Sequence, residues 1–212
     1  YDCIYCQLGP TTHRTCERRE WVPLADVLAD IEAKLPTEPQ YITLSGSGEP
    51  TLYAPIGELI RQIRRRTRIP VAVLTNGSLL WRADVREQLL EADLVIPSLD
   101  AGSAEVFEAV NRPVREIKFD QMLQGLIEFR RWFEGEYWLE IFMLEGFNTS
   151  EPELKLLVES AARVESDRVQ LNTVARPPAE SYAFAVPEPH LRQLAEMFKP
   201  PAEVIAEFPA QG

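Results

Sequence analysis

Two cysteines near the start of the chain have the spacing of a metal-binding or redox pair. Cys3 and Cys6 are separated by two residues, and Tyr5 lies between them. Thiolates at this spacing come close enough to bind one metal centre. The pair alone is ambiguous, because half of a zinc site, a redox pair and a chance pairing look the same. All three cysteines lie within the first 16 residues, which favours metal or redox chemistry over a secreted disulfide framework.

A zinc site is one interpretation of this segment. Structural zinc takes four Cys or His ligands, and His13 and Cys16 would complete a set with Cys3 and Cys6. No second Cys-x-x-Cys pair follows in the sequence. A thioredoxin-like pair would open a helix, whereas this one leads into a polar loop. A zinc-binding α/β module therefore remains an alternative.

A glycine-rich turn follows the first short apolar segment of the chain. Residues 45–52 read SGSGEPTL and come directly after the apolar residues 41–44. Gly46 and Gly48 let the backbone approach a ligand closely, and Glu49 adds a carboxylate that can pair with a cation. Taken alone, such a turn is commonplace between a strand and a helix.

Two more polar turns follow the next two apolar segments. Asn76 belongs to a Thr-Asn-Gly turn after residues 71–74, and Ser98 and Asp100 follow residues 94–96. Each is also typical of an ordinary turn or helix cap. Their shared position at strand ends is where parallel α/β sheets and barrels place their sites.

The apolar pattern predicts strands that alternate with helices, and therefore βα units around a parallel sheet. Ser150 and Glu153, with Pro152 between them, are typical of a capping box that opens a helix. No domain boundary is evident, so residues 1–212 are expected to form one domain. The expected helices cover residues 24–35, 56–66, 83–91, 120–133, 150–164 and 188–198, and the expected strands cover 41–44, 71–74, 94–96, 138–144, 169–172 and 202–208.

The composition excludes some classes of function. The formal net charge is −11, which argues against a nucleic-acid grip that depends on Lys and Arg. The one basic cluster is expected at the end of a helix, where the helix dipole favours cations: Arg61, Arg64, Arg65, Arg66 and Arg68. No apolar run approaches the roughly 20 residues that span a bilayer, and no signal peptide is recognisable. We expect a cytoplasmic protein with no membrane partner, and the lack of an initiator Met suggests a fragment.

The cysteine segment resembles the signature of the radical S-adenosylmethionine (SAM) superfamily, Cys-x-x-x-Cys-x-aromatic-Cys. Cys3 and Cys6 match its second and third cysteines and Tyr5 its aromatic residue, so the first cysteine would fall two places ahead of Tyr1. The resemblance implies a [4Fe–4S] cluster held by three thiolates, with one iron open to SAM. It implies an enzyme that reductively cleaves SAM to a 5′-deoxyadenosyl radical, which abstracts hydrogen from an unknown substrate.

The same resemblance assigns a fold and further site residues. It implies a partial (βα)6 barrel that is open on one side, with its first strand missing or truncated. Gly46, Gly48 and Glu49 resemble the family's Gly-Gly-Glu-like motif for the SAM amino group, although Ser47 replaces one typical glycine. Arg112 is a candidate for clamping a substrate carboxylate. The remaining residues expected along the cofactor site are Tyr5 near adenine, Asn76, Ser98, Asp100, Glu140, Leu171 through its backbone, and Asn172.

Three segments most resemble radical SAM proteins related to wyosine synthesis. They read YDCIYCQ, GSGEPTL and VQLNTVARPP. This subgroup raises a tRNA base as an alternative target, although the acidic chain has no obvious RNA-binding surface. The family implies an electron donor such as flavodoxin or ferredoxin. A remnant that has lost the first cysteine is a third alternative.

Overall fold

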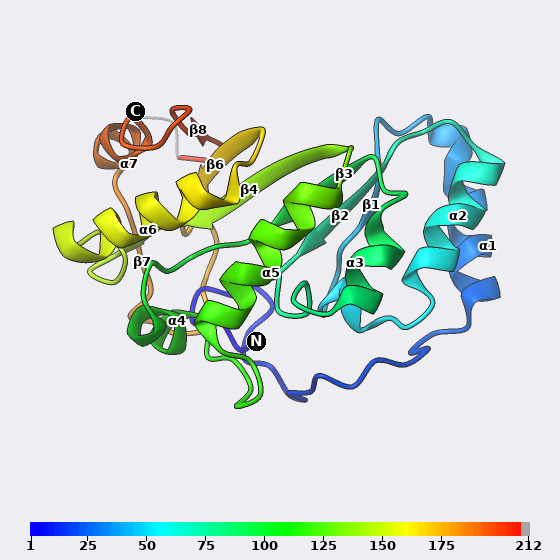
Figure 1. Cartoon of the computed structure of the whole chain (residues 1–212), viewed down its shortest axis with the longest axis horizontal. Helices are drawn as coiled ribbons and strands as arrows, with labels where there is room; N and C mark the ends of the chain where they lie inside the picture. Colours follow the sequence, from blue (N-terminus) through cyan, green and yellow to red (C-terminus); the bar gives the residue numbers. More distant parts are fainter. Residues whose placement is uncertain (209–212) are drawn as a thin grey trace.

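The computed structural model describes residues 1–208, and a six-stranded parallel sheet forms its centre (Figure 1). The strands lie in the order β1-β2-β3-β4-β6-β8, and every neighbouring pair is parallel. The predicted parallel α/β architecture is therefore confirmed. The strands are β1 (Ile42–Leu44), β2 (Val71–Thr75), β3 (Leu94–Pro97), β4 (Glu136–Phe142), β6 (Arg168–Asn172) and β8 (Glu203–Val204).

Helices connect the strands, and α5 and α6 cross in front of the sheet in Figure 1. Two short strands, β5 (Leu144–Glu145) and β7 (Phe184–Ala185), form a separate antiparallel pair. The α-helices are α1 (Leu24–Lys34), α2 (Ile56–Arg66), α3 (Ala83–Leu89), α4 (Ala104–Val110), α5 (Phe119–Trp132), α6 (Glu151–Val164) and α7 (Glu188–Ala195), and the 3₁₀ turns are η1 (Leu35–Thr37) and η2 (Pro50–Leu52).

The two faces of the sheet differ in chemistry. Along β4, Tyr137, Leu139 and Ile141 are fully buried and belong to the main apolar core with residues of α2, α3, α5 and α6. We call this side the helix face. The alternate residues Glu140 and Phe142 are half-buried and line a cavity on the opposite side, the cavity face. The period of two along the strand separates the core from the candidate site.

The start of α6 differs from the predicted capping box. Ser150 is the residue before the helix, but its side chain makes no capping hydrogen bond. Glu153 is buried and accepts hydrogen bonds from the backbone N–H groups of Gly102 (2.6 Å) and Ser103 (3.2 Å). The capping-box prediction is wrong because a loop distant in sequence offers buried donors, which would otherwise lack partners. This loop leads into α4, a helix that the apolar pattern did not predict.

The arginine cluster ends α2, as expected from the helix dipole. Arg61 pairs with Glu58 of its own helix, Arg64 with Asp93, and Arg66 with Glu32. Carboxylates of the same helix or of neighbouring segments therefore already partner three of these cations. Within residues 1–208, no helix is both long and apolar enough to cross a membrane.

Candidate functional site

A cavity of about 540 Å³ opens at the carboxyl ends of the parallel strands. This is the end at which parallel α/β proteins place their sites. The strands and the turns that follow them contribute Leu74, Thr75, Asn76, Ser98, Glu140, Phe142, Asn172 and Ile205, while the cysteine loop and the glycine-rich turn contribute Cys3, Tyr5, Cys6, Gly46, Gly48 and Glu49.

The cysteine loop is a turn held against α4. The backbone N–H of Cys6 donates to the carbonyl of Cys3 (3.1 Å), which closes the turn. The N–H of Ile4 donates to the carbonyl of Val110 at the end of α4 (3.0 Å). Figure 1 shows the N-terminus beside this helix. Because Ile4, between the two cysteines, is fully buried, Cys3 and Cys6 are fixed at the cavity wall.

The thiols of this loop have the donor chemistry of a cluster site. Cys3 and Cys6 are both free and both line the cavity. Burial, with a smaller contribution from the charge of Asp100, raises the pKa of the Cys3 thiol to about 11. An isolated thiolate is therefore disfavoured at neutral pH, and a positive metal centre would be needed to stabilise it.

The four-ligand zinc hypothesis does not survive the geometry. In the part of the chain that the structure describes, no three Cys, His, Asp or Glu side chains come together as a metal site. Cys16 instead packs against the main core, within the electrostatic range of Glu116 and Arg82. Cys3 and Cys6 thus fit a cluster as two of its thiolates, while residues 1–208 do not bring a third to them. The signature puts that third cysteine ahead of Tyr1.

Glu49 is held in place by the second strand and its turn. Its Oε1 accepts hydrogen bonds from the Thr51 N–H (3.1 Å), the Thr51 hydroxyl (2.7 Å) and the Thr75 hydroxyl (2.5 Å). Its Oε2 accepts from the Asn76 N–H (2.7 Å). Each carboxylate oxygen carries two lone pairs, so Oε2, which accepts one hydrogen bond, retains one for a ligand. A Cβ built on Gly46 or Gly48 would meet no atom within 4 Å, so the space beside these glycines is open.

Tyr5 forms part of the cavity wall. Its ring stacks on Phe142 with centroids 3.9 Å apart, and its hydroxyl donates to Asp100 Oδ2 (2.6 Å). Asp100 Oδ1 accepts from the backbone N–H of Phe142 (2.9 Å). Burial raises the pKa of Asp100 above its usual range, although these hydrogen bonds oppose the shift.

Asp100 does not line the cavity, contrary to the expectation that it lies along the cofactor site. Its carboxylate is buried and occupied by Tyr5, Phe142 and the side chain of Asn111. Because the loop before α4 is buried, Asp100 lies behind the cavity wall and stabilises it through these hydrogen bonds.

The floor of the cavity is polar. The side-chain amide of Asn172 donates to Glu140 Oε1 (3.1 Å), and Ser98 lies beside Glu140 in a backbone bridge between β3 and β4. Burial raises the pKa of Glu140, with the charge of Asp100 adding to the effect and the bond from Asn172 opposing it. The structure thus provides the Glu140 carboxylate with one side-chain hydrogen-bond donor, that of Asn172.

Two other expected site residues lie elsewhere. The side chain of Leu171 is fully buried in the core, and its carbonyl accepts from the Ile205 N–H (2.9 Å), which pairs β6 with β8. Its backbone is therefore committed to the sheet. Arg112 pairs with Glu180 (2.7 Å) and contacts the Tyr182 hydroxyl, and it does not line the cavity. Arg112 has a positive φ of 45°, and its side chain lies against the segment before β7 rather than in the cavity.

Sequence reasoning missed several residues at the site. Thr75 was noted only as part of a turn, yet its hydroxyl supports Glu49. Phe142 was assigned to a strand, and only the tertiary structure brings it against Tyr5. Arg176 belongs to the segment VQLNTVARPP, which the resemblance had already singled out; it lines the cavity, and its guanidinium donates to Gln7 Oε1 (3.0 Å).

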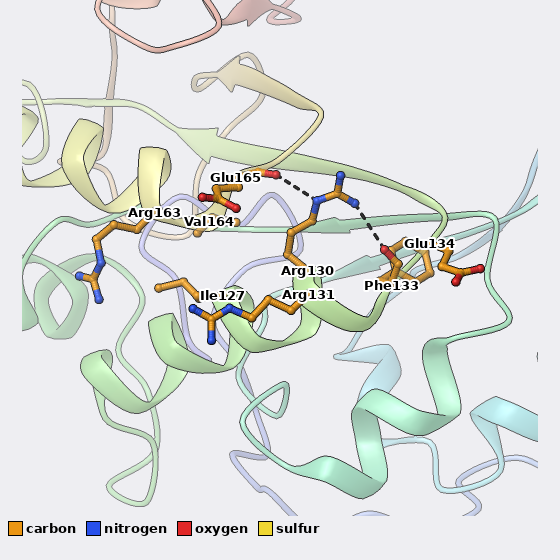
Figure 2. Close-up of a pocket in the computed structure, with 8 residues that line it drawn as sticks. All are labelled: Ile127, Arg130, Arg131, Phe133, Glu134, Arg163, Val164 and Glu165. Atoms are coloured by element: carbon orange, nitrogen blue, oxygen red, sulfur yellow. Dashed lines mark hydrogen bonds between the residues drawn. The ribbon is translucent and has the colours of Figure 1, made fainter.

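A second cavity, of about 460 Å³, lies between the ends of α5 and α6 (Figure 2). There Arg130 donates to the carbonyls of Glu165 (3.0 Å) and Phe133 (3.4 Å) and pairs with Asp167 (2.6 Å). This arginine satisfies backbone groups at the two helix ends, where cations are favoured. The lining of this second cavity holds no cysteine, so the cavity at the carboxyl ends of the strands is the stronger candidate for the functional site.

The comparisons with known proteins agree with this geometry. The family model of the radical SAM superfamily matches residues 1–158. The chain belongs to the radical SAM superfamily. Enzymes of this superfamily use a [4Fe–4S] cluster and SAM, which are the two cofactors that the sequence predicted. The predicted family is therefore confirmed.

Two curated relatives match most of the chain, and a third matches about half of it. A Brachyspira hyodysenteriae protein named GTPase Obg is 40% identical over 212 residues, which are 99% of this chain and 31% of that protein. A UPF0026 protein of Methanocaldococcus jannaschii is 36% identical over 86% of this chain and 58% of its own length. This radical SAM chain thus spans less than two thirds of either relative. A tRNA 4-demethylwyosine synthase of Pyrococcus abyssi is 27% identical over 55% of the chain and 34% of that enzyme.

Solved structures share the fold. SuiB of Streptococcus suis, determined with bound S-adenosylmethionine, superposes with a TM-score of 0.71 at 15% identity and covers 99% of this chain and 48% of SuiB. A radical SAM methyltransferase of Sphaerobacter thermophilus gives a TM-score of 0.62 at 14% identity, over 99% and 63% of the two chains. The partial-barrel prediction is confirmed.

Proposed function

We propose that this chain is the catalytic core of an enzyme that cleaves SAM reductively and removes a hydrogen atom from a substrate. The observation that carries the proposal is the position of one turn, in which Cys3 and Cys6 face the same cavity as Glu49 at the carboxyl ends of the strands. When bound, a reduced cluster would supply the electron that converts SAM to methionine and a 5′-deoxyadenosyl radical. Residues 1–212 would form one radical SAM core domain.

The chain's own residues would bind and orient the cofactors. Cys3 and Cys6 would ligate iron through their sulfur atoms. Glu49 would accept a hydrogen bond from the methionine ammonium group through the remaining acceptor site of Oε2. Gly46 and Gly48 support this role because they leave space for a ligand against the backbone.

The polar floor would hold the nucleoside part of SAM or the substrate. Glu140, Asn172 and Ser98 offer acceptors and donors suited to ribose hydroxyls. Asn76 anchors Glu49 through its backbone N–H. Tyr5, stacked on Phe142, would close the wall beside the adenine and exclude water from the reacting centre.

The experiment that tests the proposal is anaerobic reconstitution with iron and sulfide. The protein is expressed with the residues that precede Tyr1 in its gene, reduced, and assayed for 5′-deoxyadenosine after SAM is added. We expect product from the wild type and none from Cys3→Ala or Cys6→Ala. Cys16→Ala is the matched control and should keep the activity, because Cys16 packs against the core away from the cavity lining. A wild type that binds iron but never consumes SAM, with or without candidate substrates, would contradict the proposal.

A tRNA base is a second candidate for the substrate. The 27% identity with a demethylwyosine synthase supports it, whereas the net charge of −11 opposes it. A gel-shift assay with total tRNA at two salt concentrations distinguishes a tRNA substrate from a substrate that is not RNA, since specific use of RNA requires salt-sensitive binding.

The three free cysteines and the need for a low-potential electron support a cytoplasmic enzyme that receives electrons from a flavodoxin or ferredoxin.

A further inference from the structure

Asn111 connects the cysteine loop to the buried carboxylate behind it. It caps the C-terminus of α4 and is buried, with 3% of its surface exposed. Its side-chain nitrogen Nδ2 donates to the sulfur of Cys3 (3.5 Å) and to Asp100 Oδ2 (2.6 Å). Both hydrogens of the amide are therefore used, one on sulfur and one on a carboxylate.

The carboxylate determines which way this amide points. If the amide were flipped, its oxygen would lie 2.6 Å from Asp100 Oδ2, where two acceptors repel each other. Asp100 is itself fixed by the Tyr5 hydroxyl and the Phe142 N–H. The donor that faces Cys3 is thus set by a chain of buried hydrogen bonds.

The same orientation leaves Asn111 Oδ1 buried without a partner. A buried acceptor without a hydrogen bond is destabilising. The amide keeps both of its donors on Cys3 and Asp100 although its oxygen goes unpaired, so these two contacts define its role.

We propose that Asn111 is a positioning residue whose N–H bond to the Cys3 sulfur raises the reduction potential of the bound cluster. This inference rests on the proposed function, in which Cys3 ligates iron. Reduction adds an electron to the cluster and makes its sulfur ligands more negative, so a donor on sulfur stabilises the reduced form. The acidic groups Glu49, Glu140 and Asp100 around the site act in the opposite direction.

The first test compares midpoint potentials. The protein with its native upstream residues is reconstituted, and the cluster is titrated with reductant while its EPR signal is recorded. In Asn111→Leu, which keeps the volume and removes the donor, we expect the reduced-to-oxidised ratio at a given potential to fall about tenfold. This corresponds to a potential about 59 mV lower for a one-electron couple.

Asn148→Leu is the matched control. Asn148 is also fully buried and donates to the carbonyls of Asp100 and Phe142 (both 2.8 Å), but it does not contact Cys3. We expect its cluster to keep the wild-type potential. Equal shifts in both variants would mean that a loosened loop, not the bond to sulfur, sets the potential, and this would overturn the inference. An unchanged potential in Asn111→Leu would overturn it as well.

A second measurement needs no substitution and applies if either variant fails to fold. Wild-type holoprotein is labelled with [¹⁵N]asparagine, and the reduced cluster is examined by pulsed EPR. We expect a weak nitrogen coupling together with an exchangeable proton coupling, and a cluster that lacks both overturns the inference. Iron analysis of the same sample distinguishes a failure of this inference from a failure of the proposed function, because a wild type that takes up no cluster refutes the ligand role of Cys3 instead.

Discussion

The two faces of β4 use the same backbone for opposite purposes. On the helix face, Tyr137, Leu139 and Ile141 are fully buried in apolar surroundings. On the cavity face, Glu140 and Phe142 are half-buried and border a space of about 540 Å³. Substitutions on the first face should act on stability alone, whereas substitutions on the second should also act on cofactor binding.

The difference also explains where polar groups are tolerated. The helix face is covered by helices, so an unpaired polar atom there would cost free energy. The cavity face provides its polar groups with partners, as in the pair of Glu140 with Asn172 and the four donors around Glu49. Five substitutions and one control test this division, and they follow in order of expected size.

The largest effect is expected from Leu139→Ala on the helix face. Removal of a fully buried leucine side chain leaves a cavity in the core and costs about 2–5 kcal/mol of unfolding free energy. Urea unfolding monitored by circular dichroism measures the loss. A variant as stable as the wild type would show that this face is not the core.

Glu49→Gln should affect both stability and cofactor binding. An amide NH₂ group in place of either oxygen faces a hydrogen-bond donor and leaves it unpaired, which costs about 1–3 kcal/mol. We also expect the dissociation constant for SAM, measured by calorimetry on the reconstituted protein, to rise at least tenfold. Glu108→Gln, on the exposed part of α4, serves as the control and should change neither quantity.

Two glycines give a paired test of the faces. A Cβ on Gly125 of α5 would lie 2.3 Å from the backbone nitrogen of Trp81, so Gly125→Ala should cost about 1–3 kcal/mol through overpacking, although alanine favours a helix. A Cβ on Gly48 meets no atom within 4 Å, so Gly48→Ala should stay within about 0.5 kcal/mol of the wild type. The SAM affinity of Gly48→Ala should fall. Thermal unfolding and a SAM titration measure the two quantities, and a Gly48→Ala variant that loses stability or a Gly125→Ala variant that loses only SAM affinity would contradict the division.

The smallest effect is a pH dependence at Glu140. Burial raises the pKa of this carboxyl in the folded protein, so its ionised form is disfavoured there. Ionisation therefore lowers stability as the pH rises from the unfolded-state pKa of about 4.3 through the folded-state value. Glu140→Gln should be more stable than the wild type at neutral pH and lose this advantage in acid. An advantage that grows as the pH falls would mean that the pKa of Glu140 is lowered.

The sequence predicted most of the elements, and most of the residues that it proposed for the site line the cavity. The helix over residues 56–66 has the bounds of α2, since its apolar positions recur at helical spacing and its end carries arginines. Glu49, Asn76 and Ser98 were found because parallel strands carry functional groups at their carboxyl ends. Shorter elements, such as α4 and the β5–β7 pair, are too brief for a periodic signal.

What the sequence determined by itself is local. The spacing of Cys3 and Cys6, the glycines before Glu49 and the alternation along β4 depend on residues a few positions apart, and their chemistry can be read in order along the chain. What only the tertiary structure decided is which distant groups meet. Asp100 supports Tyr5, Asn111 donates to Cys3, and Glu153 accepts from Gly102, because buried donors and acceptors must find partners and the fold alone determines which lie within reach.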